Sequence, residues 1–161
     1  IYYVYMEEYD FSTTETGASD TIPIEAGQIK KGGLIMIKDQ PCKVSNVSTS
    51  KTGKHGSAKC NFVANNIFNN KKLEEMLGST HATSMPVVTR KEYTLMDINE
   101  EGYVTLLDDD GETREDIKLP DYPEDYCRII QKEFDDGKQL IVTVLKACGH
   151  EQIMAHKVDS S

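Results

Sequence analysis

The chain has 161 residues, which suits one ordinary domain or two small ones. Its hydrophobic fraction of 38% and charged fraction of 28% are typical of a foldable soluble protein, and no run approaches the roughly 18 apolar residues of a membrane-spanning helix. No secretion signal opens the chain, so we expect a cytoplasmic protein without a membrane partner.

The net charge of -9 is unevenly distributed. Residues 1–20 hold five acids and no bases, residues 21–87 hold nine bases and four acids, and residues 88–161 hold nine bases and eighteen acids. The local sums are therefore -5, +5 and -9. An acidic chain argues against a general nucleic-acid-binding protein, but the basic middle segment predicts one local face for a polyanion.

The first twenty residues are predicted to be a disordered acidic tail, because they are polar and lack hydrophobic periodicity. Residues 1–5 precede Met6 and differ from the acidic stretch after it, so we interpret them as a cloning remnant or an upstream extension. They are excluded from the fold prediction.

Residues 21–86 are predicted to form a small β-barrel. Short β-rich runs separated by turn residues are typical of such a barrel. The stretch KKLEEMLG is compatible with either a strand or a helical turn, and the polar stretch ending at Pro86 marks a domain boundary. The expected strands are Leu34–Lys38, Cys42–Val47, Lys59–Ala64 and Leu73–Leu77, with a turn at Asp39-Gln40-Pro41.

Residues 87–161 are predicted to form an OB-fold. Three strands, a helix and two more strands follow one another, which is the order of that five-stranded barrel. The helix is expected from a cap at Asp121 to Gly137, with one apolar face. That face is formed by Tyr126, Ile129, Ile130 and Phe134, and the strands are Tyr93–Ile98, Tyr103–Leu107, Thr113–Leu119, Leu140–Ala147 and Gln152–Val158.

The four cysteines are widely spaced and form no Cys-x-x-Cys pair. We expect free buried thiols in a reducing cytosol. The histidines lack the spacing of zinc ligands, so we predict no metal and no cofactor.

The loop Ser48–Ala58 concentrates small polar residues and lysines. Gly53 and Gly56 flank Lys54-His55, and glycine removes side-chain bulk on both sides of the lysine. We therefore expect Lys54 to project into solvent. Lys51 and Lys59, with Lys43 in the preceding strand, add positive charge that attracts phosphate.

Several roles compete for this loop. A phosphate-binding P-loop does not fit, because its pattern places glycine and Ser or Thr where Ser48 and His55 stand. A Schiff-base lysine needs a desolvated pocket, and a Ser57/His55 pair lacks an orienting carboxylate within the loop. A solvated hairpin loop without function fits the spacing but leaves the paired glycines unexplained.

Residues 48–59 read STSKTGKHGSAK, and this stretch resembles the signature of the eukaryotic initiation factor five-A family, the hypusine-containing translation factors. The resemblance extends from about residue 20 to the C-terminus. Further matching stretches are Leu34–Lys43, Ile67-Phe68 before Lys71-Lys72, Ser79-Thr80-His81, residues 111–116 and residues 141–145. Ser57 departs from the family's usual histidine, which bears on the hydroxylation of the lysine.

This resemblance implies a mainly β protein with an SH3-like N-terminal barrel and a C-terminal OB-fold. Lys54 would become hypusine by aminobutyl transfer from spermidine and hydroxylation, with deoxyhypusine synthase and deoxyhypusine hydroxylase as partners. The contact residues would be Lys51, Thr52, Gly53, His55, Gly56, Ser57 and Lys59.

The resemblance also implies binding to the large ribosomal subunit beside the acceptor end of peptidyl-tRNA. There the protein would promote elongation at difficult sequences such as polyproline, and termination. We expect a translation factor that is not an enzyme. We further expect it to form a weak homodimer and to enter the nucleus transiently. The alternative is a generic SH3/OB RNA-binding module without lysine modification.

Overall fold

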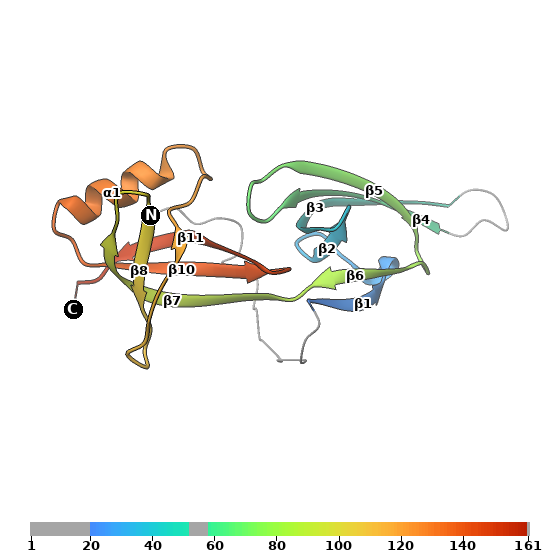
Figure 1. Ribbon diagram of the computed structural model, residues 1–161. Coiled ribbons are helices and arrows are strands. Elements are labelled where there is room, and N and C mark those ends of the chain that lie inside the picture. Colours follow the sequence, from blue (N-terminus) through green and yellow to red (C-terminus); the bar gives the residue numbers. More distant parts are fainter. Residues whose placement is uncertain (1–19, 52–57, 161) are drawn as a thin grey trace. The chain divides into compact units, whose positions relative to one another are not determined.

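The computed structural model describes residues 20–51 and 58–160 (Figure 1). The predicted disordered tail lies outside the described residues except for Asp20. The described chain forms β-strands with one α-helix, as predicted, and divides between Val88 and Thr89 into two compact units. No helix in the described ranges has the length and apolar character needed to cross a membrane.

The first unit contains an antiparallel four-stranded sheet in the order β2-β3-β4-β5 and a separate pair of strands, β1 and β6. A short 3-10 helix, η1, follows β1, and β6 lies against β2. The bounds are β1 Thr21–Glu25, η1 Ala26–Gln28, β2 Leu34–Ile37, β3 Gln40–Lys51, β4 Ala58–Asn66, β5 Lys72–Gly78 and β6 Ala82–Pro86.

The core of this barrel comes from residues that alternate along the strands. Phe62 is completely buried on β4, with Cys60 and Ala64 on the same face. They pack against four residues of β2 and β3: Ile35, Ile37, Cys42 and Val44. At the edge of the sheet, β5 pairs with β4, and the ambiguous stretch KKLEEMLG is therefore a strand.

Three predictions for this unit were wrong. The turn expected at Asp39-Gln40-Pro41 is at Lys38-Asp39, where φ values of 51° and 62° suit a two-residue hairpin loop and Ile37 pairs with Gln40. The polar stretch before Pro86, in which no strand was predicted, contains β6, and Ala82–Pro86 pairs with Thr21–Glu25 of β1. Residues Ser48–Lys51, expected in a loop, continue β3.

The second unit confirms the predicted order of strands and helix. Its sheet has the order β11-β10-β7-β8-β9. Tyr103–Leu107 and Leu140–Ala147 have the predicted bounds. The elements are β7 Val88–Ile98, β8 Tyr103–Leu107, β9 Thr113–Lys118, α1 Tyr126–Asp135, β10 Leu140–Ala147 and β11 His150–Val158.

Helix α1 packs on this sheet through the predicted face. Tyr126 and Ile130 are completely buried, and Ile129 and Phe134 pack against the same core. The helix begins later than predicted, because Asp125 at its N-cap has a left-handed φ of 66° and provides no side-chain cap. It ends as predicted before Gly137, whose φ is 84°.

Two polar networks tie elements of the second unit together. Arg114 on β9 donates to both carboxylate oxygens of Glu151 on β11, at 2.8 and 3.0 Å, and to those of Asp116 at 2.7 and 2.8 Å. This clasp joins the two edge strands of the sheet. Buried His156 on β11 lies 2.7 Å from the Tyr126 hydroxyl and 2.7 Å from a Glu133 oxygen, so β11 holds both ends of α1.

Candidate functional site

The candidate site is at the end of the first unit where β3 ends and β4 begins. The β3–β4 ladder continues to the pair Lys51 and Ala58, which leaves the six residues 52–57 between the two strands. Of the predicted site residues, Lys51 and Lys59 are therefore described. The other six predicted site residues lie outside the described residues: Thr52, Gly53, Lys54, His55, Gly56 and Ser57.

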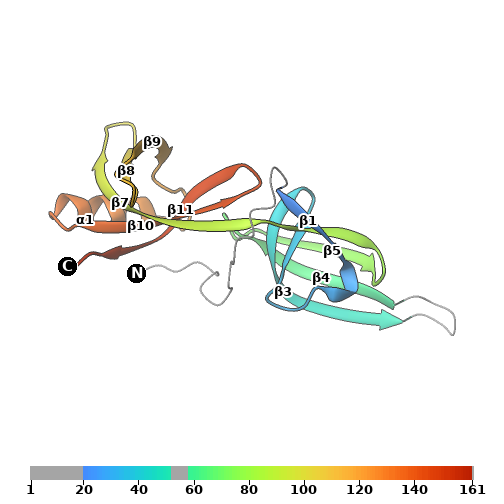
Figure 2. The same cartoon turned by 90° about the horizontal axis from the view of Figure 1, so that it is seen from below.

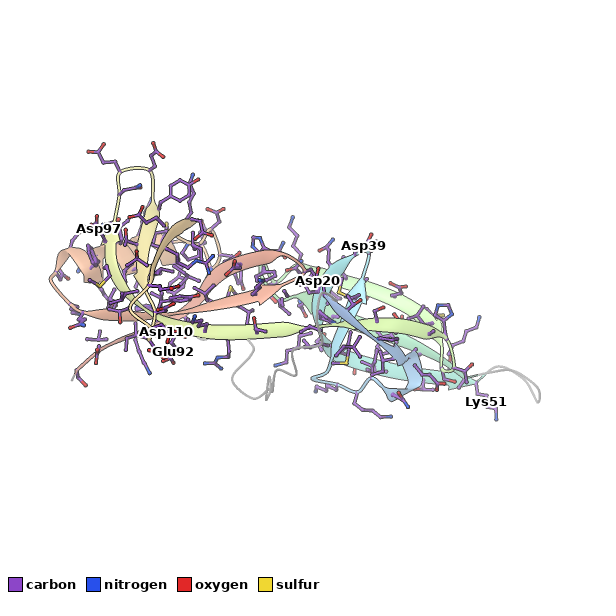
Figure 3. The ribbon with its side chains drawn as sticks, turned by 60° about the horizontal axis from the view of Figure 1, so that its bottom comes forward. Asp20, Asp39, Lys51, Glu92, Asp97 and Asp110 are labelled. Carbon is purple, nitrogen blue, oxygen red and sulfur yellow. The ribbon has the colours of Figure 1, made fainter. Side chains whose placement is uncertain are left out.

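Lys51 and Lys59 are exposed on the last rungs of this ladder. The salt bridges within the described part of the chain involve neither of them. Lys51 points away from the barrel at one end of the unit (Figure 3). Asp39 precedes the opposite end of β3, which at about 3.4 Å per residue is about 37 Å away. Neither Lys51 nor Lys59 thus forms an ion pair with a carboxylate of the described residues.

The outermost part of β3 carries no core side chain. Its last four residues are all exposed: Ser48, Thr49, Ser50 and Lys51. Because successive residues of a strand point to opposite faces, both faces of the sheet are exposed here. The hydrophobic core stops at the level of Cys60, which is buried. The strands thus extend a polar, basic ribbon beyond the barrel, and both faces of it are available to a partner.

The β4 side of the ribbon has an additional support that sequence patterns did not predict. The Ala58 carbonyl accepts a hydrogen bond of 2.8 Å from the Ser79 amide in the β5–β6 connection. The Ser79 carbonyl in turn accepts one of 2.8 Å from the Gly27 amide in η1. These bonds join backbone groups from three distant segments, so side-chain chemistry gives no signal for them.

No group of three His, Cys, Asp or Glu side chains in the described ranges is arranged to hold a metal ion. The four cysteines are free thiols, with Cys42 and Cys60 buried and Cys127 and Cys148 half-buried. Burial raises the pKa of Cys42 to about 11, which makes its thiolate scarce near neutral pH.

Both units match known families. Residues 19–81 match the family described as translation initiation factor 5A-like, N-terminal. Residues 87–157 match the family described as eukaryotic elongation factor 5A hypusine, DNA-binding OB fold. Eukaryotic translation initiation factor 5A-1 of Arabidopsis thaliana is 53% identical over 94% of this chain and 95% of its own length. The chain belongs to the eukaryotic translation initiation factor 5A family.

Other relatives of this 5A-family protein agree in sequence and structure. Eukaryotic translation initiation factor 5A of Zea mays is 53% identical over 94% of this chain and 94% of its own length. A solved translation initiation factor 5A family protein from Naegleria fowleri has a TM-score of 0.82, with 44% identity over 86% of this chain and 99% of that one. The solved factor 5A from Methanococcus jannaschii has a TM-score of 0.65 at 26% identity, over 87% and 96% of the two chains.

Membership in the 5A family makes this chain a translation factor with an SH3-like barrel and an OB-fold. The expected family resemblance is thereby confirmed. The matched relatives are named as translation factors rather than as enzymes. The roles predicted for Lys54 and the residues around it remain predictions.

Proposed function

We propose that this protein is a hypusine-dependent translation factor whose Lys54 is modified and then inserted beside peptidyl-tRNA on the large ribosomal subunit. The proposal rests on one observation above all. The β3–β4 ladder ends at Lys51 and Ala58, so the six residues that contain Lys54 connect the ends of a polar ribbon that projects beyond the core.

The charge around this ribbon supports an RNA partner. Lys51 and Lys59 are exposed and lie on the last two rungs, where carboxylates of the described residues form no ion pair with them. Uncompensated lysines bind phosphate by releasing condensed counterions. Such a narrow basic ribbon suits a crowded RNA cavity better than a flat protein surface.

The chemistry of the modification fits a long, flexible amine. An aminobutyl arm from spermidine gives Lys54 a second cationic nitrogen, and hydroxylation adds a hydroxyl that donates and accepts hydrogen bonds. This side chain would reach phosphates and ribose hydroxyls of the tRNA acceptor end where a backbone does not fit. Faster peptide-bond formation at polyproline, and faster termination, would follow from positioning the substrate.

The proposal assigns the remaining roles accordingly. The chain is the substrate of deoxyhypusine synthase and deoxyhypusine hydroxylase, and it is not itself an enzyme. It needs no bound cofactor, because the ribosome supplies the catalytic centre. It acts in the cytoplasm, and its weak self-association and nuclear visits play no part in the mechanism.

Peptide mass spectrometry of the protein from its native host tests the modification. A Lys54 peptide heavier by an aminobutyl group and a hydroxyl is expected, whereas protein made without the modifying enzymes lacks this increment. Lys54→Arg should abolish rescue of polyproline translation while leaving the melting temperature unchanged. Lys51→Arg is the matched control, because it keeps the charge of the ribbon and leaves Lys54 available.

Two results would contradict the proposal. One is an unmodified Lys54 in active native protein, which would favour a generic SH3/OB RNA-binding module. The other is a Lys54→Arg protein that still supports polyproline synthesis at the wild-type rate. Loss of activity in both arginine variants would instead indicate that arginine itself is not tolerated in the ribbon.

A further inference from the structure

The outer face of the first unit's sheet is polar where the ribbon begins. Strands β3, β4 and β5 lie side by side there, as Figure 1 and Figure 2 both show. Cys60 and Phe62 on β4 point into the core, so the residues that alternate with them point to the outer face. Residues paired across strands share a face, which gives two rows of three residues. The rows are Ser48–Asn61–Met76 and Ser50–Lys59–Gly78, and we call these six residues the outer platform.

The outer platform presents groups that the described part of the protein does not use. The side chains of Ser48, Ser50 and Asn61 form no hydrogen bond with another residue of the ranges 20–51 and 58–160. Met76 beside Asn61 is 59% exposed, more than any other large hydrophobic side chain that the structure describes. A Cβ atom on Gly78 would meet nothing within 4 Å, so this corner is open. Two hydroxyls, an amide and a thioether are therefore available to a ligand.

Lys59 gives the outer platform a positive charge that the carboxylates of its own sheet do not cancel. β2, β3 and β4 contain no acidic residue, and β5 contains Glu74 and Glu75. Glu75 pairs with Phe62 and so points to the other face, whereas Glu74 is four residues from Gly78, or about 14 Å along the strand. At physiological salt, exposed charges more than about 8 Å apart are largely screened. The ammonium group of Lys59 is thus available to an anion.

The composition of the outer platform fits a nucleotide better than a protein surface. Protein interfaces are enriched in aromatic residues and depleted in lysine and serine, and this platform has no aromatic residue and one apolar side chain. An unstacked nucleotide needs an apolar group against its base, hydrogen-bonding groups at the base edge and the ribose, and a cation at its phosphate. Methionine sulfur contacts aromatic rings favourably, and a nucleobase is such a ring. The platform is about 10 Å wide across three strands, with about 7 Å between its rows, which gives room for a single extruded nucleotide.

We propose that the outer platform binds one unstacked nucleotide of single-stranded RNA. Lys59 binds its phosphate, Met76 packs against its base, and the Asn61 amide donates to and accepts from the base edge. The hydroxyls of Ser48 and Ser50 bond to the ribose 2′-hydroxyl, which distinguishes RNA from DNA. This inference rests on the proposed function, because it names the kind of RNA that the ribbon meets beside Lys59.

Hexauridylate, a single-stranded RNA whose bases stack weakly, tests the outer platform in solution. Its titration into full-length protein with isotope-labelled methionine methyl groups should shift the NMR signals of the Met76 methyl group and the Asn61 side-chain amide. Met96 is the matched control, because it is a methionine 51% exposed on β7 in the second unit, and its signal should stay in place. Met76→Ser should raise the Kd for hexauridylate about threefold, whereas Met96→Ser should leave it unchanged. Hexadeoxyuridylate should bind about fivefold more weakly, because it lacks the hydrogen bond of the 2′-hydroxyl.

Three results of this titration would contradict the inference. Equal shifts at Met76 and Met96 would show that the RNA has no preference for the outer platform. A Kd that Met76→Ser leaves unchanged would refute the contact with the base. Equal Kd values for hexauridylate and hexadeoxyuridylate would refute the contact of the two serines with the ribose.

Photocrosslinking on purified ribosomes identifies the partner of the outer platform. Met76→benzoylphenylalanine should yield a crosslinked product that ribonuclease digestion removes. A crosslink to ribosomal protein alone would overturn the inference in favour of a protein partner, and the absence of any crosslink from ribosome-bound protein would overturn it as well. If the wild-type protein does not sediment with ribosomes, the proposed function fails instead, and the hexauridylate titration still decides whether the outer platform binds RNA.

Discussion

Replacing Lys51 and Lys59 together with glutamine should reduce the salt dependence of ribosome binding. Both ammonium groups are exposed on the last rungs of the ribbon and form no ion pair with a described carboxylate. Each phosphate contact adds about 0.7 to 0.9 to the slope of log K against log salt concentration. Loss of two contacts therefore lowers the slope by about 1.4 to 1.8.

This change in slope is large enough to measure. Between about 50 and 200 mM salt, the wild-type protein should lose about ten times more affinity than the Lys51→Gln/Lys59→Gln protein. Fluorescence anisotropy or sedimentation with purified ribosomes over this range gives both slopes. Modification at Lys54 must be complete in both proteins, because its charges also contribute to the slope.

The control protein is Lys31→Gln/Lys38→Gln, which loses the same net charge. Both of these lysines are exposed. Lys38 lies in the turn between β2 and β3, and Lys31 precedes Gly32, whose amide donates to the carbonyl of Val44, seven residues before Lys51 on β3. Their replacement should leave the slope close to that of the wild type. Equal slopes for the wild-type and Lys51→Gln/Lys59→Gln proteins would show that the ribbon does not contact phosphate.

Four further predictions concern stability and reactivity. Arg114→Met should lower the free energy of unfolding by about 2 kcal/mol, because Glu151 and Asp116 lose a charged hydrogen-bond partner; an unchanged urea midpoint would contradict this. Arg114 holds the pKa of Asp116 below its usual range, so that part of the stability is present above the ordinary aspartate pKa and is lost as pH falls through the lowered value. The difference between the two proteins should therefore shrink below about pH 4, and a constant difference down to pH 2 would count against the pairing. Phe62→Ala should cost about 3 to 5 kcal/mol in the same assay, and a loss below about 1 kcal/mol would mean that the barrel refills the space. Cys42 should react with iodoacetamide at pH 8 more slowly than the two half-buried cysteines, because burial raises its pKa to about 11; equal labelling by mass spectrometry would disprove its protection.

Local patterns predicted the second unit well. The alternating run Tyr103–Leu107 precedes a turn in which the Asp108 carboxylate accepts from the Asp110 and Glu112 amides, at 2.9 Å each. The turn chemistry and the period of two thus agree over adjacent residues. The helix face was equally clear, but its start was not, because the left-handed Asp125 has no sequence signature beyond its residue type.

The first unit was less predictable because its missing strands depend on distant partners. Ala82–Pro86 is polar and contains little apolar periodicity, and it becomes a strand by pairing with Thr21–Glu25. Strand propensity depends on such a partner more than helix propensity does. The lysines of the ribbon were recognised from the sequence, but Ser48–Lys51 were expected in a loop and instead continue β3. The hydrogen bonds that join Gly27, Ser79 and Ala58 are backbone bonds that no local pattern encodes.

Strand β5 at the edge of the four-stranded sheet has a consequence for aggregation. It carries Lys72, Glu74 and Glu75 within seven residues, and Lys72 lies 3.7 Å from Glu74. A second chain that added a strand here would have to desolvate these ions, which discourages open-ended polymerisation. The protein can thus keep a sheet edge at its surface without seeding aggregates.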